Sequence, residues 1–367
     1  MTDLLTAESR PCLKGSAMAV GLPGDGLLFP FLPRPEAQLL AVAPWQKAFF
    51  QLLDGERTLK EIAALLPLFG HEVSLAEVLA FVRDLDSRLL LEEGRDGAKE
   101  DRYSRQRLFF GAWRRRGRSF AQEAQKRLAS SRVVLFGVGG GGCHVLQSLA
   151  SFGLGGITVV DGDVVTPSNL NRQCLYRPDD VGRSKIDVLR RELPRINGDV
   201  AFSFVDRVMR GAEDFASLIA DADLAILTAD SPRQSIFGWF DDALFRVFRP
   251  GLFTAGVSLG GLSLGPLVVP GETACYRCSL PPWTPDFDRP EVKVLNGAYR
   301  HGVIAPHLAV LGGLMALETV RFLTGFEEPL TRGARLGLDL SRWEAVRTPL
   351  SARPGCRCHR AERGDGP

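Results

Sequence analysis

Short apolar runs alternate with amphipathic stretches through most of the chain after residue 130, a pattern typical of alternating strands and helices. Runs rich in Val, Ile, Leu and Phe predict strands at 132–136, 157–160, 200–205, 224–227, 252–258 and 263–269. Apolar residues at helical spacing predict helices at 143–152, 186–193, 215–220 and 307–323. This order predicts an α/β fold with a Rossmann-like, doubly wound sheet.

The first 95 residues show a different pattern. Short apolar pieces broken by Gly and Pro, at 18–28 and 39–42, indicate a small hairpin region. Three short helices are predicted after it, at 45–53, from Thr58 as N-cap to 66, and at 74–91. A small sheet combined with three short helices is typical of a winged-helix domain.

Composition narrows the class of protein. The chain has 367 residues, 45% of them hydrophobic, so it can bury ordinary cores in two domains. Its formal net charge of +2 argues against a nucleic-acid partner. We find no apolar run long enough to span a bilayer and no signal peptide, so we expect no membrane partner. Seven unevenly spaced cysteines favour the reducing cytoplasm over a disulfide framework.

The chain divides at its polar and basic stretches. Residues 1–95 form the predicted winged-helix domain. Residues 96–130 begin as a polar linker and continue as an Arg-rich stretch, which predicts solvated helices at a dimer contact. Residues 131–367 form the predicted α/β domain, and nearly all candidate site residues lie in it.

Candidate nucleotide-binding residues follow the first strand of this domain. Gly137, Gly139 and Gly142 fit the spacing G-x-G-x-x-G, and Gly140 lies between them. The tight turn requires residues without Cβ, and the following helix N-terminus offers amide groups to a phosphate. Asp161 ends the next predicted strand, where such folds place a carboxylate that binds ribose. These five residues predict a nucleotide site.

Polar and basic residues after Asp161 indicate which nucleotide is used. Asn169, Arg172 and Gln173 follow closely, and Lys185 comes slightly later. A nicotinamide cofactor has no use for two fixed cations beside its pyrophosphate. Cleavage of ATP between its α- and β-phosphates requires such cations, because negative charge grows as pyrophosphate leaves. Arg172 can clamp phosphate with two hydrogen bonds, and Lys185 supplies a compact charge.

The stretch that begins at Asp161 reads D-x-D-x-V-x-x-S-N-L-x-R-Q, and G-x-S-K follows it. It resembles the ThiF-type adenylating enzymes, relatives of the ubiquitin-activating enzymes. The resemblance implies an adenylyltransferase that uses ATP and Mg²⁺. It assigns nucleotide binding to Asp161, Asp163, Asn169 and Gln173, and neutralisation of phosphate charge to Arg172 and Lys185.

The same resemblance assigns two further residues. The family carries D-x-T-D-N, with an aspartate that helps to hold magnesium. This chain reads L-T-A-D-S, so Asp230 matches although the following Asn does not; the alternative role of Asp230 is an N-cap. The family's domain begins with R-Y-x-R-Q, whose second arginine reaches the ATP of a partner subunit. In R-Y-S-R-Q this residue is Arg105, which implies a homodimer with Arg105 acting in trans.

Two cysteine pairs lie far apart in the chain. Cys275 and Cys278 form C-x-x-C, and Cys356 and Cys358 form C-x-C beside His359. Two such pairs can supply four ligands to a structural Zn²⁺. The family has C-x-x-C at both places, so either Cys358 or His359 completes the second pair, and we favour Cys358. The competing interpretation is four free thiols.

The other cysteines, Cys12, Cys143 and Cys174, are expected to be small structural hydrophobes. Residues 279–300 correspond to the family's crossover loop over the active site and contain no cysteine. Family members that form thioesters take a cysteine from this region. A thioester is therefore disfavoured, and we expect a group within the substrate or another small nucleophile to attack the adenylate.

The N-terminal pattern L-x-x-G-x-R-T-x-x-E-I, followed by a helix and L-L-L-E-E, resembles PqqD-like domains, which bind leader peptides in ribosomal peptide maturation. The combination resembles microcin C-type and pantocin-type peptide-modifying enzymes. It implies adenylation of a carboxylate or amide in a ribosomally made precursor peptide. The alternatives are activation of the C-terminal glycine of a ubiquitin-like sulfur carrier, a non-catalytic peptide-binding partner and, for the small domain, a dimerisation or docking role.

Overall fold

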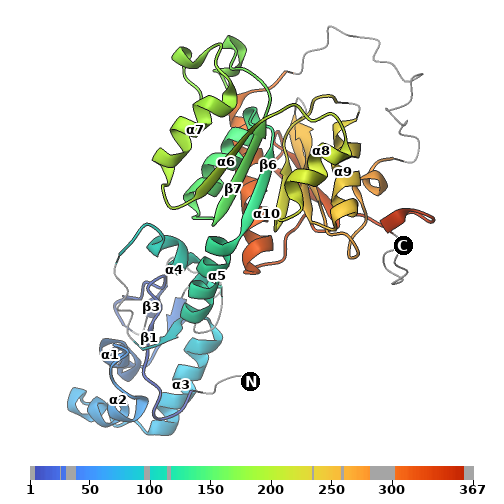
Figure 1. Cartoon of the computed structure of the whole chain (residues 1–367). Helices are drawn as coiled ribbons and strands as arrows, with labels where there is room; N and C mark the ends of the chain where they lie inside the picture. The colour runs from blue at the N-terminus through green and yellow to red at the C-terminus, as the bar shows by residue number, and fades with distance from the viewer. Residues whose placement is uncertain are drawn as a thin grey trace. The chain divides into compact units, whose positions relative to one another are not determined.

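The computed structural model describes residues 5–24, 26–29, 39–94, 100–113, 117–233, 235–257, 260–281 and 302–358. The chain divides into two compact units, Met1–Lys126 and Arg127–Pro367. Figure 1 colours the first unit from blue to teal and the second from green to red. Each unit has a hydrophobic core of its own.

The first unit contains two small antiparallel sheets. β1 (Pro11–Leu13) pairs with β5 (Leu91–Glu93). β3 (Gly26–Leu28) pairs with β2 (Val20–Gly21) on one side and with β4 (Leu39–Ala41) on the other. β2 and β3 thus form the hairpin that the sequence predicts.

Short helices surround these sheets. They are α1 (Pro44–Leu52), α2 (Leu59–Leu65), the 3-10 helix η2 (Leu66–Phe69), α3 (Leu75–Ser87), α4 (Ser104–Ala112) and α5 (Arg118–Ser130), which begins in this unit. α2 begins as predicted because the Thr58 hydroxyl accepts the Glu61 N–H at 3.1 Å and the Glu61 carboxylate accepts the Thr58 N–H at 2.7 Å. Buried aromatic and aliphatic side chains from α1, α2 and α3 fill the core.

The helix predicted over 74–91 is shorter than expected. α3 ends at Ser87, and Leu89 has a φ of 64°, which is incompatible with a continuing helix. Leu91–Glu93 forms β5 instead. Leu90 and Leu91 are fully buried, so this apolar run belongs to a strand rather than to a helical face.

One eight-stranded sheet forms the centre of the second unit, in the order β13-β12-β11-β10-β9-β6-β7-β8. Its parallel strands are β6 (Arg132–Phe136), β7 (Gly156–Asp161), β8 (Ala201–Asp206), β9 (Leu224–Leu227) and β10 (Gly251–Val257). Its antiparallel extension is β11 (Gly261–Val268), β12 (Ala334–Asp339) and β13 (Glu344–Pro349). The sheet is therefore mixed, with an antiparallel extension added to the Rossmann-like parallel strands.

The helices of the second unit form two groups (Figure 1). They are α6 (Gly140–Ser151), α7 (Lys185–Ile196), α8 (Ala212–Ile219), α9 (Ile236–Val247) and α10 (Ala305–Thr324). α6 packs against α7 and α10, whereas α8 packs against α9. Phe136, Phe215, Phe240 and Phe253 form the core between α8, α9 and one face of the sheet. The parallel strands end at a common edge, where such folds bind ligands.

α10 meets the length and composition of a membrane-spanning helix, so the expectation that the chain has no such run was wrong. Half of the apolar window of α10 is buried, and the helix packs against α6. Burial of this kind is typical of a core helix, so the feature is weak evidence for a membrane segment.

Candidate active site and metal centre

The glycine-rich turn joins β6 to α6 at the carboxyl edge of the sheet. Gly137 has a φ of +88°, and a Cβ there would lie 2.5 Å from the Ala229 backbone nitrogen. A Cβ on Gly142 would lie 2.1 Å from the Gly137 carbonyl, and one on Gly140 2.2 Å from a leucine side chain. A Cβ on Gly139 would meet nothing nearer than 3.9 Å. Backbone atoms therefore require glycine at Gly137 and Gly142, the end of a leucine side chain can yield to a Cβ on Gly140, and Gly139 leaves space that a ligand can occupy.

Two side chains hold this turn by hydrogen bonds, and the sequence analysis identified neither of them. The Thr228 hydroxyl donates to the carbonyl of Gly137 at 2.5 Å, and the buried Tyr176 hydroxyl donates to the carbonyl of Val138 at 2.9 Å. Thr228 follows β9 and stands two residues before Asp230, which is a weak sequence signal. Tyr176 gives no signal, because only the folded chain brings it to the turn.

Asp161 ends β7 and holds the same turn. One carboxylate oxygen accepts the Val138 N–H at 2.6 Å, and the other accepts the Asp163 N–H at 2.9 Å. The Lys185 ammonium, at the first position of α7, lies 3.5 Å from Asp161 and 2.8 Å from Asp163. Lys185 is only 4% exposed, so its charge is buried between two carboxylates. A phosphate oxygen would compete with Asp163, which is largely exposed, for this ammonium.

Two hollows adjoin at this edge. The smaller has a volume of about 170 Å³ and the larger about 930 Å³. Both are lined by Gly139, Asp163, Lys185, Thr228 and Asp230. Because these five residues line both hollows, one elongated ligand can extend from the first into the second.

The segment after β7 lines the larger hollow. Asn169 accepts the Thr166 N–H through its side chain at 3.1 Å, and the Arg172 guanidinium donates to the carbonyl of Ser168. Gln173 is 4% exposed, and its side-chain oxygen has no hydrogen-bond partner among the described residues. A buried amide oxygen without a hydrogen-bond partner is uncommon in a folded protein. A ligand in the hollow that donates a hydrogen bond would satisfy this oxygen.

The two remaining predicted site residues differ in their surroundings. Asp230 is exposed, follows β9 and lines both hollows, so its carboxylate is open to a cation. Arg105 belongs to α4 of the first unit, with its side chain 86% exposed and its guanidinium 3.7 Å from the Glu100 carboxylate. Its action in trans stays a prediction.

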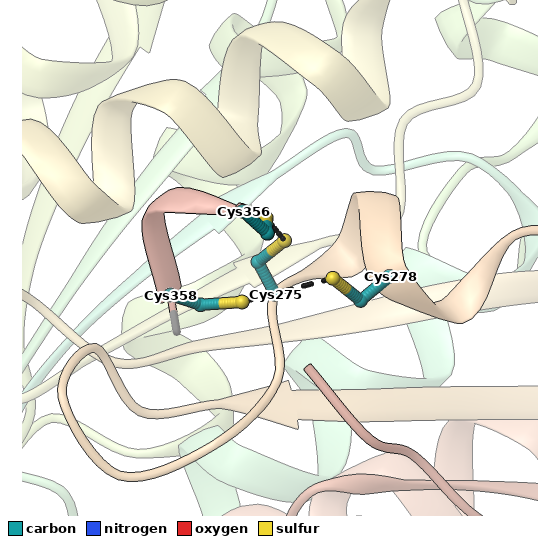
Figure 2. Close-up of side chains that lie close together, drawn as sticks. All are labelled: Cys275, Cys278, Cys356 and Cys358. Atoms are coloured by element: carbon teal, nitrogen blue, oxygen red, sulfur yellow. Dashed lines mark hydrogen bonds between the residues drawn. The ribbon is translucent and has the colours of Figure 1, made fainter. Parts of the chain in front are cut away.

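Four sulfur atoms meet away from these hollows (Figure 2). We call Cys275 and Cys278 the first cysteine pair, and Cys356 and Cys358 the second. The Sγ atoms of Cys275 and Cys356 lie 3.5 Å apart and those of Cys278 and Cys358 3.7 Å apart, and all four lie within 4.8 Å of one another. Four thiolates about 2.3 Å from a tetrahedral Zn²⁺ lie about 3.8 Å apart, so the four thiols fit zinc. His359 lies outside the described residues.

Cys174 departs from the expectation of a small buried hydrophobe. Cys143 is fully buried as expected, but Cys174 is exposed. The Cys174 Sγ lies 3.3 Å from the Gln147 side-chain oxygen and 3.7 Å from the His144 ring. A hydrogen bond with the Cys143 thiol lowers the pKa of Cys174 to about 7. Cys174 is therefore a reactive thiol close in sequence to Arg172.

The turn at Gly137, the buried Lys185 and the two adjoining hollows together define a nucleotide-binding enzyme built on a Rossmann-like fold. Residues 103–358 match the ThiF family, and the chain belongs to that family.

Curated relatives support the same assignment. The chain is 32% identical to the molybdopterin-synthase adenylyltransferase of Escherichia coli (strain K12) over 239 residues, which is 65% of this chain and 91% of the relative. It is 31% identical to the sulfur carrier protein ThiS adenylyltransferase of the same organism over 257 residues, 70% of this chain and 93% of the relative. The protein is thus an ATP-dependent adenylyltransferase with a ThiF-type α/β domain.

Solved structures resemble a longer part of the chain. E. coli MccB with ATP matches with a TM-score of 0.78 at 23% identity, covering 95% of this chain and 99% of MccB. The microcin C7 biosynthetic enzyme MccB in complex with N-formylated MccA matches equally well, with a TM-score of 0.78 at 23% identity over the same shares. At this identity the likeness shows a common fold.

The glycine turn gives a matched pair of variants. We expect Gly137→Ala to destabilise the protein by about 1–3 kcal/mol or more, because its φ is strained for Ala and its Cβ would clash. Gly139→Ala should keep the melting temperature but weaken MgATP binding at least about tenfold, or ~1.4 kcal/mol, because its methyl group would occupy ligand space. Thermal unfolding and calorimetric titration measure the two effects. Wild-type affinity in Gly139→Ala would contradict the assignment of ligand space there.

Cys174 should react at a lower pH than an ordinary cysteine. Since the thiolate is the nucleophile, the rate of alkylation by iodoacetamide should rise with pH and reach half its plateau near pH 7, which is about the pKa of Cys174. Peptide mapping by mass spectrometry at several pH values gives the rate at each cysteine. The buried Cys143 should stay unmodified, and Cys174→Ser supplies the control. A midpoint above pH 8.5 would contradict the interpretation.

Proposed function

We propose that this enzyme adenylates a carboxylate or amide of a ribosomally made precursor peptide. The carrying observation is the extent of the structural likeness: MccB matches 95% of this chain and therefore includes the first unit. The two E. coli adenylyltransferase relatives match only 65% and 70% of the chain. MccB has been solved with MccA, a peptide partner, which supports a peptide substrate for a chain with this extra unit.

The two hollows favour one orientation of ATP. The smaller one is walled by apolar side chains, among them Val160, Met209 and Ile236, and suits the base. The phosphates would pass Gly139 and enter the larger hollow beside Arg172 and Lys185. Asn169 and Gln173 line that hollow as well and would donate or accept hydrogen bonds there.

The reaction needs little help from a general base, since a carboxylate is already a nucleophile. Its oxygen attacks the α-phosphorus, the bond from this phosphorus to the bridging oxygen of the β-phosphate breaks, and pyrophosphate leaves with the electron pair. Arg172, Lys185 and a trans Arg105 would offset the charge that develops. Asp230 would hold Mg²⁺, which neutralises phosphate charge when bound.

A third hollow supports an extended peptide as the other substrate. It has a volume of about 680 Å³, runs along β10, β11, β12 and β13, and shares Arg233, Gly256 and Val257 with the larger hollow. Gly256 and Gly260 line it, and a Cβ on either would meet no atom within 4 Å. Gly256 has a φ of +116°, which L side chains rarely adopt, and Gly260 directly precedes β11, so the backbone along this part of the hollow carries no side chains. Arg233, which sequence reasoning missed, can bind a carboxylate of such a peptide at the junction.

The first unit would hold the leader of the precursor, as in PqqD-like domains. In the described residues, β2 and β4 each pair on one side only, so either can accept an added strand. Leu68 and Phe69 of η2 are exposed and offer apolar contacts. Holding the leader raises the effective concentration of the reacting segment at the ATP site.

The second candidate is activation of a sulfur carrier at its C-terminal glycine, which the likeness to the sulfur carrier protein ThiS adenylyltransferase favours. Pyrophosphate release separates the two candidates. The cognate precursor peptide, encoded by a short neighbouring reading frame, should stimulate release, whereas a ubiquitin-like sulfur carrier should not. Stimulation by the carrier alone would overturn the peptide proposal and leave the adenylyltransferase assignment intact.

Residues 1–95 of the first unit should be needed for recognition and not for chemistry. We expect turnover on full precursor to exceed turnover on leaderless core by about tenfold or more, because the tether raises effective concentration. Deleting residues 1–95 should reduce turnover on full precursor to the leaderless value while MgATP affinity stays unchanged. A control chain with Leu68→Ser and Phe69→Ser tests the exposed apolar contacts in the intact fold. Equal turnover in all these combinations would contradict the leader role.

Arg105 provides a test of assembly. If it acts in trans, inactive Arg105→Ala subunits mixed with inactive Lys185→Ala subunits should recover up to about a quarter of the sites, because one site of the mixed dimer has both residues intact. Arginine fingers contribute on the order of a thousandfold in rate, so recovery should stand well above background. Pyrophosphate release is the measurement, with exchange verified by differently tagged subunits. Absence of recovery would place Arg105 in cis or outside the site.

A further inference from the structure

A single buried carboxylate contacts both halves of the cysteine cluster. Asp241 lies on α9 and is 0% exposed. One of its oxygens accepts the N–H of Tyr276 at 2.9 Å, and the other accepts from the Arg357 guanidinium at 2.6 Å. Tyr276 lies within the first cysteine pair, and Arg357 is the residue between the two cysteines of the second. The two pairs are thus fastened to the same side chain.

Arg357 is fixed by α9 at two further points. Its second arm donates to the Asp242 carboxylate at 2.5 Å, and its guanidinium lies 4.5 Å from the ring centre of Phe245. Arg277, the other residue inside the first pair, lies 3.2 Å from Asp242. An arginine held by two carboxylates and a ring keeps its backbone, and therefore its two cysteine neighbours, in place.

We call the ion pair of Asp241 and Arg357 the clamp. Charge explains why both of these residues are needed. A Zn²⁺ ion with four thiolates carries net negative charge, and the Asp241 carboxylate adds more in a buried place. The Arg357 cation offsets this charge next to the cluster. Without it, Asp241 would be a buried charge lacking its cation, an arrangement that strongly destabilises proteins.

The clamp also reaches the wall of the larger hollow. The Tyr276 ring stacks on Phe253 at 4.6 Å and on Phe237 at 5.4 Å, with interplanar angles of 15° and 13°. Phe237 lines the larger hollow. The residue that Asp241 holds by its N–H therefore packs directly behind this wall.

We propose that Asp241 and Arg357 are positioning residues that pre-assemble the four thiols on α9, so that metal affinity depends on this clamp as well as on the cysteines. The metal ligands alone, separated by 81 residues between Cys275 and Cys356, would have to be gathered by the ion itself. Partners that orient metal ligands are commonly worth about 10–100-fold in metal affinity.

Asp241→Asn and Asp242→Asn form a matched pair of variants. Each removes one carboxylate that pairs with Arg357 on adjacent residues of α9, but the Asp241 side chain is 0% exposed whereas that of Asp242 is 36% exposed, so only Asp241→Asn leaves Arg357 without its buried partner. Zinc transfer from the full-length protein to the chromogenic chelator 4-(2-pyridylazo)resorcinol measures retention. We expect about tenfold or faster release from Asp241→Asn and less than about threefold from Asp242→Asn. Equal release from both variants, or a wild-type protein that binds no zinc, would overturn the proposal.

A second measurement separates positioning from general stability. Melting temperatures are taken for zinc-loaded and zinc-stripped protein, wild type and Asp241→Asn. A positioning role makes the zinc-dependent rise smaller in the variant, whereas a merely structural role leaves the rise unchanged and overturns the proposal. If Asp241→Asn does not fold, the variant Arg357→Met, which changes a partly exposed side chain, is tested by the same two measurements. Zinc release from Arg357→Met at the wild-type rate would overturn the proposal.

Discussion

The candidate nucleotide site depends on the buried Asp161 carboxylate. It joins three elements at once: the end of β7, the glycine turn through the Val138 N–H, and the start of α7 through Lys185. A buried carboxylate is stable only when such donors and cations surround it. The same contacts that satisfy Asp161 therefore hold Gly139 and Lys185 on the walls of both hollows. The stability of the turn and the geometry of the site thus depend on the same hydrogen bonds and ion pair.

Much of the second unit could be predicted because local patterns there agree with the fold. The strand predicted at 224–227 has its observed bounds, and the motif between Asp161 and Lys185 could be assigned because its residues and spacing resemble those of the ThiF family. Thr228 and Tyr176 could not be found in this way, because their roles depend on carbonyl groups brought near by folding. Sequence spacing identifies residues on one turn or strand end, but not hydrogen bonds between distant segments.

The outer strands and the first unit show the opposite situation. β13 is exposed along its length and has no buried, alternating face, so its sequence resembles a loop. The apolar run at Leu89–Leu91 looked helical until the left-handed Leu89 turned the chain into β5. Asp241 gave no signal either, since a lone acidic residue within a helix usually faces water. In each case tertiary packing, which the sequence alone does not display, determined the outcome.

The cysteine cluster also orders events during synthesis of the chain. Cys356 is made 81 residues after Cys275, and β12 and β13 lie between them. At ~5–20 residues per second, the ribosome needs on the order of ten seconds to cover this interval. During that time the first cysteine pair exists without its second half. The nascent enzyme therefore passes through a stage in which the first cysteine pair lacks the second, while Asp241 of α9 is already available to accept the N–H of Tyr276.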